Sequence, residues 1–220
     1  MKITLYGDSI LKGVVMKNGR YHIDSSWEKT FAEKTSSDIN NRARFGNTIQ
    51  RALPGIEKDC LEKAESGISV IEFGGNDCDY KWKEIEKDPS GMHYSNTPPQ
   101  LFEKLYRKTV RMLRESGRET VILNLPPIDS ERFFHHVCRD GLNEDRVLDW
   151  LGDMDAIYRW QEMYSWMVER IAKAENIECI DIRSSFIGEN GVKRELLCED
   201  GIHPSPAGQK TICDALLAAV

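Results

Sequence analysis

Apolar, β-prone runs alternate with helical patterns along this chain of 220 residues, and this alternation limits the folds that it can adopt. The clearest strand is residues 68–73, a run rich in β-branched side chains that ends at two glycines. Further strands are predicted at residues 2–6, 120–125 and 177–182, with a weak edge strand within 38–44. Because parallel strands need long crossover connections, strands separated by helices predict an α/β fold, with helices on both faces of a parallel sheet.

Helical patterns occupy the intervals between the predicted strands. They cover residues 48–64, 98–114, 147–174 and 206–219. One more helix is predicted to begin near Ser26, which is its expected N-cap. Pro54-Gly55 is expected to delay or interrupt the helix of residues 48–64, and Ser205 is expected to cap the last helix.

The helix predicted at residues 147–174 is rich in aromatic side chains. Its apolar residues at helical spacing, which are expected to face the core, are Ile157, Trp160, Tyr164, Met167 and Ile171. Two other long stretches, residues 78–96 and 128–145, show no such pattern and are expected to be irregular loop insertions near the strand ends.

Length and charge restrict the class of protein. The chain is expected to form one domain, residues 1–220. A formal net charge of −6 without a basic cluster argues against a nucleic-acid partner, because phosphate binding needs a positive surface. No apolar stretch is long enough for a bilayer and no secretory leader precedes the first strand, so a cytoplasmic protein with no membrane partner is expected. The six scattered cysteines form no zinc-like pattern, which predicts free thiols and no metal site.

The first predicted strand ends at Gly7-Asp8-Ser9-Ile10. Ligands of parallel α/β sheets bind beyond the carboxyl ends of the strands, so Ser9 is expected beside a cleft. Its hydroxyl becomes a good nucleophile only when a neighbouring base takes the proton. Taken alone, the same residues are also typical of an ordinary turn. The interpretation of Ser9 as a nucleophile therefore needs a base from elsewhere in the chain.

Asp200-Gly201-Ile202-His203-Pro204, just before the last helix, supplies that base. The aspartate can accept the Nδ1–H of the imidazole while Nε2 faces the serine, and it stabilises the imidazolium as it forms. We therefore predict Ser9 as nucleophile, His203 as general base and Asp200 as its partner. The other histidines have no such neighbour and are expected at the surface, although His135-His136 can approach the cleft from a long loop.

Two motifs between these ends can stabilise the negative charge that develops during acyl transfer. Asn76, in Gly74-Gly75-Asn76-Asp77, offers a side-chain amide. Gly46 offers a backbone N–H that a ligand can approach closely, because glycine has no Cβ. The predicted oxyanion hole therefore comprises the Ser9 N–H, Gly46 and Asn76. Each motif alone is equally typical of a turn.

The four motifs in this order resemble the SGNH, or GDSL-type, hydrolase family over nearly the whole chain. The residues that match its name are Ser9, Gly46, Asn76 and His203. Isoleucine stands where the family usually has leucine after the serine, and the motif around Gly46 is the least specific. The resemblance implies a three-layer α/β/α sandwich with a mostly parallel sheet of about five strands. It also implies ester or thioester hydrolysis through an acyl-enzyme, without a metal or organic cofactor.

Two aspartates of these motifs are assigned structural roles. Asp8 and Asp77 are expected to hold their loops in place by accepting hydrogen bonds from backbone N–H groups.

Aromatic and apolar residues close to the motifs are expected to bind the substrate. The predicted substrate-binding residues are Ile10, Phe45, Tyr80, Trp82 and Phe133. Other bulky residues of the two insertions, which are expected either to line the cleft or to hold the loops on the body, are Met92, Tyr94, Phe134 and Val137. Aromatic rings suit both the stacking of sugars and the burial of acyl chains.

The partner predicted from these observations is a small-molecule ester. The leading hypothesis is a serine esterase, either a short-acyl esterase or a carbohydrate acetylesterase. The alternatives are a lysophospholipase or thioesterase, an acyltransferase that passes the acyl group to an alcohol, and a non-catalytic ligand-binding module on the same fold.

Overall fold

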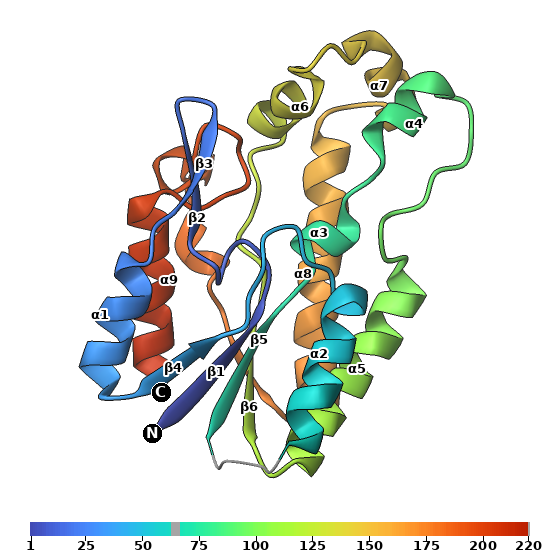
Figure 1. Ribbon diagram of the computed structural model, residues 1–220. Helices are drawn as coiled ribbons and strands as arrows, with labels where there is room; N and C mark the ends of the chain where they lie inside the picture. The colour runs from blue at the N-terminus through green and yellow to red at the C-terminus, as the bar shows by residue number, and fades with distance from the viewer. Residues whose placement is uncertain (63–66, 220) are drawn as a thin grey trace.

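A five-stranded parallel sheet forms the centre of the protein, in a computed structural model that describes residues 1–62 and 67–219 (Figure 1). Its strand order is β4-β1-β5-β6-β7, and every pairing is parallel. The strands are β1 (Lys2–Gly7), β4 (Asp38–Asn41), β5 (Ile68–Glu72), β6 (Glu119–Leu123) and β7 (Glu178–Ile180). The predicted parallel sheet, including its weak edge strand, is confirmed.

Helices cover both faces of this sheet, as Figure 1 shows. On one face lie α1 (Ser26–Thr35) and α9 (Pro206–Ala219). On the other lie α2 (Ile49–Leu61), α5 (Pro99–Glu115) and α8 (Asp155–Glu175). The result is the three-layer α/β/α arrangement that the resemblance implies.

Side chains of the central strands enter the two cores alternately, because successive residues of a strand point to opposite faces. On β1, Ile3 and Leu5 pack with α1 and α9, whereas Tyr6 packs on the side of α2, α5 and α8. On β5, Val70 packs on the side of α1 and α9, and Ile71 packs on the side of α2, α5 and α8. This two-sided burial explains why these strands are nearly continuous apolar runs in the sequence.

Of the two predicted N-caps, Ser205 and Ser26, the structure confirms the first and not the second. The Ser205 hydroxyl accepts the N–H of Gly208 at 3.2 Å, which confirms Ser205 as the cap of α9. Thr48 caps α2 in the same way, and Pro54 lies inside that helix without breaking it. The described helix ends at Leu61, and the expected continuation to residue 64 lies outside the described residues. Ser26 is the first residue of α1 and does not cap it.

The single helix predicted over residues 147–174 is wrong, because the chain breaks it into α7 (Glu144–Leu151) and α8. Gly152 adopts a φ of 78°, which glycine tolerates, and its N–H bonds to the carbonyl of Leu148 to end α7. Within α8, four of the five expected core residues are buried: Ile157, Tyr164, Met167 and Ile171. Trp160 is half-buried and lines the cleft.

The two stretches expected to be irregular contain short helices. They hold α4 (Trp82–Lys87) and α6 (Ser130–Cys138), while α3 (Gly75–Cys78) forms directly after β5. The Asp129 carboxylate caps α6 by accepting the N–H of Arg132. Phe134 packs with Val147 of α7 in a small core of its own. These helices lie beyond the carboxyl ends of the strands (Figure 1). Packing against one another stabilises α6 and α7 there.

An unpredicted hairpin, β2 (Val14–Lys17) with β3 (Arg20–Ile23), follows the Ser9 loop. Its turn is Asn18-Gly19, with positive φ at both residues, the sequence and geometry that favour two-residue hairpins. Minor elements complete the fold: β8 (Ile187–Gly188), β9 (Gly191–Val192) and the short 3₁₀ turns Ser184–Phe186 and Arg194–Leu196. Within the described ranges, no helix combines the length and apolarity needed to cross a bilayer.

Candidate active site

The predicted site residues come together beyond the carboxyl ends of the strands. Ser9 follows β1, Gly46 lies in the loop after β4, and Asn76 lies in α3 directly after β5. Asp200 and His203 occupy the loop before α9. All five line or lie against one cleft, because parallel strands deliver their ends to the same edge of a sheet.

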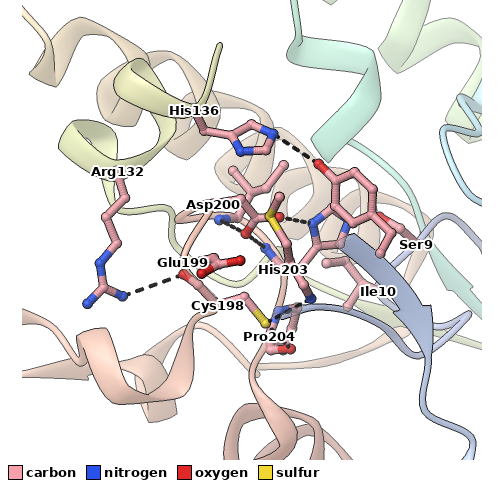
Figure 2. Close-up of polar contacts among 12 residues, drawn as sticks. Ser9, Ile10, Arg132, His136, Cys198, Glu199, Asp200, His203 and Pro204 are labelled. Carbon is pink, nitrogen blue, oxygen red and sulfur yellow. Dashed lines mark hydrogen bonds and ion pairs between the residues drawn. The ribbon is translucent and has the colours of Figure 1, made fainter. Parts of the chain in front are cut away.

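Ser9, His203 and Asp200 form a chain of hydrogen bonds (Figure 2). The Ser9 Oγ lies 2.9 Å from His203 Nε2, and His203 Nδ1 lies 2.6 Å from Asp200 Oδ2. An ionised carboxylate can only accept, so Nδ1 carries the proton and Nε2 is left to accept from the serine hydroxyl. The three side chains are buried, which keeps competing water away from these bonds.

Hydrogen bonds keep the Asp200 carboxyl ionised in spite of its burial. Burial raises its pKa, but the hydrogen bond and charge of His203 and two backbone N–H groups act against it, and the net pKa lies below the ordinary value. Those N–H groups belong to Ile202 and His203, and both donate to Oδ1. One carboxylate oxygen therefore holds the loop while the other holds the imidazole.

Asp8 connects the Ser9 loop to Asn76. Its Oδ1 accepts the N–H of Ile10 at 2.9 Å, and its Oδ2 accepts one hydrogen of the Asn76 amide, also at 2.9 Å. An amide NH₂ has two hydrogens, so one remains for an acceptor in the cleft that Asn76 lines. The expected loop-holding roles of Asp8 and of Asp77, which accepts the N–H of Ile49, are confirmed.

Backbone donors complete the candidate oxyanion hole. Among the described residues, the N–H groups of Ser9 and Gly46 have no protein acceptor. Gly46 has a φ of 68°, which favours glycine, and a Cβ built there would meet no atom within 4 Å. The side-chain amide of Asn47 reaches the carbonyl of Gly7 at 3.4 Å and so ties this loop to the end of β1.

Glu72, at the end of β5, is a buried acid that the sequence analysis missed. Both of its carboxyl oxygens are buried near the Asp8 carboxyl, and within the described residues neither has a hydrogen-bond partner. Burial, and then the negative charge of Asp8, raise the pKa of Glu72 well above its ordinary value. The signal in the sequence that could have identified Glu72 was a charged residue within an otherwise apolar strand.

The site opens into a cleft of about 770 Å³. All five predicted substrate-binding residues line it: Ile10, Phe45, Tyr80, Trp82 and Phe133. Val137 lines it as well, whereas Met92 and Tyr94 are exposed outside it and Phe134 is buried behind α6.

Aromatic rings form a continuous wall at one end of the cleft. Tyr80 contacts Trp82, Trp150 and Trp160, with ring centroids 4.9–5.8 Å apart. Trp82 in turn meets Phe133 edge to face at 6.0 Å. This wall offers flat apolar surfaces to a ligand, and the lining also includes the charged Lys81, Glu84 and Arg139.

Comparison with known proteins agrees with this fold. The family model described as GDSL-like lipase/acylhydrolase matches residues 5–211, so the chain belongs to that family and is an ester-hydrolysing enzyme. The sequence has no significant match among curated proteins.

Solved structures share the whole fold at low sequence identity. An acetyl xylan esterase, AlAXEase, is 21% identical with a TM-score of 0.66, and the match covers 100% of both chains. A catalytic mutant of Axe2, an acetylxylan esterase from Geobacillus stearothermophilus, is 17% identical with a TM-score of 0.69, over 99% of this chain and 92% of that one. A lipase/acylhydrolase from Enterococcus faecalis is 18% identical with a TM-score of 0.63, over 99% and 94%.

Proposed function

We propose that the protein is a serine esterase that hydrolyses short-acyl esters, with acetylated carbohydrates as the leading substrate class. The observation that carries this proposal is the hydrogen-bonded chain from Ser9 Oγ through His203 to the buried carboxylate of Asp200. Such a chain activates a hydroxyl for attack on a carbonyl carbon, which is the first step of acyl transfer.

In the proposed reaction, Ser9 Oγ attacks the ester carbonyl and His203 Nε2 takes the hydroxyl proton. The N–H groups of Ser9 and Gly46 and the free hydrogen of the Asn76 amide stabilise the oxyanion. His203 then returns the proton to the leaving alcohol, which leaves an acyl-enzyme on Ser9. A water molecule activated by the same histidine hydrolyses this intermediate and regenerates the serine.

The substrate class is supported by the lining of the cleft and by the related structures. Flat aromatic surfaces such as Tyr80 and Trp82 suit the faces of sugar rings. Two of the structural neighbours bear the names of acetylxylan esterases. The cytoplasmic location stays a prediction.

The proposal is tested by labelling with a fluorophosphonate, which reacts with activated serines. One label per chain is expected in the wild type, at Ser9 by peptide mapping, and almost none in His203→Ala. The labelled site then justifies a panel of acetylated sugars and short-chain aryl esters, with acetate release as the readout. A folded wild type that neither reacts nor hydrolyses any ester contradicts the proposal, and acetyl transfer to an added alcohol at low concentration would identify an acyltransferase instead.

Replacing Asn76 by alanine is expected to lower kcat by about 10²–10³-fold, because it removes a donor to the oxyanion. The measurement is steady-state hydrolysis of an acetyl ester, with Asn40→Ala on the edge strand as a matched control that lies outside the cleft. A change in KM alone would assign Asn76 to substrate binding rather than to the oxyanion hole.

A further inference from the structure

Two exposed aromatic side chains cover the outer side of the His203 imidazole. The ring of Phe45 stacks on it with centroids 5.9 Å apart and an angle of 9°, and the ring of Tyr21 meets it edge to face at 5.2 Å. Tyr21 and Phe45 also touch each other, at 5.0 Å. Tyr21, which lines the cleft, therefore packs against the ring that delivers a proton to the leaving alcohol in the proposed reaction.

The hairpin that carries Tyr21 is attached to the loop of the candidate base. The N–H of Met16, the cross-strand neighbour of Tyr21, bonds to Cys198 Sγ at 3.3 Å, and the N–H of Gly19 in the turn donates to the Glu199 carboxylate. Cys198 and Glu199 directly precede Asp200 (Figure 2). The position of Tyr21 relative to His203 is thus set by hydrogen bonds from backbone N–H groups of the hairpin to the Cys198 and Glu199 side chains.

A second histidine fixes the direction of the Tyr21 hydroxyl. His136, on α6, lies with Nε2 2.9 Å from the Tyr21 oxygen, and Arg139 donates to its Nδ1 at 2.9 Å (Figure 2 shows His136 pointing toward the site). Because a guanidinium can only donate, Nδ1 must be an acceptor and the imidazole proton must sit on Nε2. His136 therefore donates to the Tyr21 oxygen, and the hydroxyl hydrogen of Tyr21 is directed elsewhere.

That hydroxyl keeps its proton at neutral pH. Burial and then the charge of Asp200 raise the pKa of Tyr21, against an opposing effect of Arg139. Among the described residues, the Tyr21 hydroxyl hydrogen has no protein acceptor, because its one hydrogen-bond partner, His136, donates to the oxygen. Tyr21 and His136 both line the cleft that contains Ser9. The hydroxyl is thus a free donor at the mouth of the site.

We propose that Tyr21 donates a hydrogen bond to an oxygen of the alcohol part of the ester, and that His136 is the residue that positions it. This inference rests on the proposed esterase function and deepens it. It selects alcohols with a further oxygen close to the ester bond, such as polyols and sugars, over alcohols without one. His203 must face the leaving oxygen to protonate it, so a donor packed against the His203 ring meets the alcohol rather than the acyl group.

The test compares two acetate esters that form the same acetyl-enzyme, xylose tetra-acetate and phenyl acetate. Tyr21→Phe keeps the ring against His203 and removes only the hydroxyl. It is expected to lower kcat/KM for the sugar acetate by about fivefold to tenfold, the effect of one neutral hydrogen bond, and to change that for phenyl acetate by less than about twofold. Tyr94→Phe is the matched control, because Tyr94 is exposed outside the cleft.

His136→Phe tests the positioning role in a double-mutant cycle. The quantity compared is the ratio of kcat/KM for the sugar acetate to kcat/KM for phenyl acetate. His136→Phe alone is expected to lower this ratio by about twofold to threefold, and in the Tyr21→Phe background it is expected to have no further effect. An equal loss in both backgrounds would show that His136 does not act through Tyr21 and would overturn that part of the proposal.

The remaining outcomes separate the two proposals. An unchanged ratio in Tyr21→Phe, an equal fall for both esters, or a wild type that hydrolyses phenyl acetate but no sugar acetate overturns the assignment of Tyr21 and leaves the esterase function intact. A folded wild type that is inactive on both esters and unreactive with the fluorophosphonate contradicts the proposed function itself. Thermal unfolding of each variant confirms that the compared proteins are folded.

Discussion

Replacing Ser9 by alanine is expected to lower kcat by about 10⁶-fold, to the level that binding and the oxyanion donors alone support. The physical reason is that no other hydroxyl lies within hydrogen-bonding distance of His203 Nε2 among the described residues. The fold should survive, because within the described part of the chain the Ser9 side chain bonds only to His203. The Ser9 carbonyl, which the substitution keeps, accepts the N–H of Val14. Acetate release and thermal unfolding measure the two parts of this prediction.

A serine outside the cleft provides the control for Ser9. Ser130 begins α6 and its hydroxyl bonds to Asp155, so Ser130→Ala should leave kcat within about twofold of the wild type. Comparable activity in a folded Ser9→Ala variant would remove Ser9 from the mechanism and with it the acyl-enzyme.

Changing Asp200 to asparagine is expected to lower kcat by about 10⁴-fold, although the two side chains have nearly the same shape. Oδ1 of Asp200 accepts the N–H groups of Ile202 and His203, which requires the carbonyl oxygen of an asparagine at that position. The amide NH₂ must then face His203 Nδ1 and donate to it. The imidazole would carry its proton on Nε2, where it can no longer accept from the Ser9 hydroxyl.

The loss in Asp200→Asn is measured as kcat on an acetyl ester, together with the rate of fluorophosphonate labelling. Both should fall, because both depend on removal of the serine proton. Asp153→Asn serves as the control, since Asp153 is exposed and paired with Arg159. Full activity in a folded Asp200→Asn variant would mean that His203 does not depend on this carboxylate for its tautomer.

The sequence analysis predicted the scaffold well because its signals are local. Alternating strands and helices required only the apolar runs of strands such as Ile68–Glu72 and the periodicity of helices such as Pro99–Glu115. The candidate nucleophile and base were found because Asp200 and His203 lie in one short loop and Ser9 directly follows a strand. The sequence analysis failed to predict helices that are short and stabilised by packing, such as Ser130–Cys138.

The residues that surround the candidate triad could not be found in the same way. The bond between Tyr21 and His136 joins positions 115 residues apart, and that between Asp8 and Asn76 joins positions 68 apart. Such contacts depend on how loops from different strands fold over one edge of the sheet.

The chain by itself determined the order of strands and helices and the chemistry of the motifs at the strand ends, because backbone propensity, capping and short-range spacing act within a few residues. Only the tertiary structure decided which groups face Ser9 and His203. It placed Phe45 and Tyr21 on the imidazole, the buried carboxyl of Glu72 near Asp8, and the aromatic wall along the cleft. Burial and the proximity of distant segments create these interactions, and neither is a property of any local stretch of sequence.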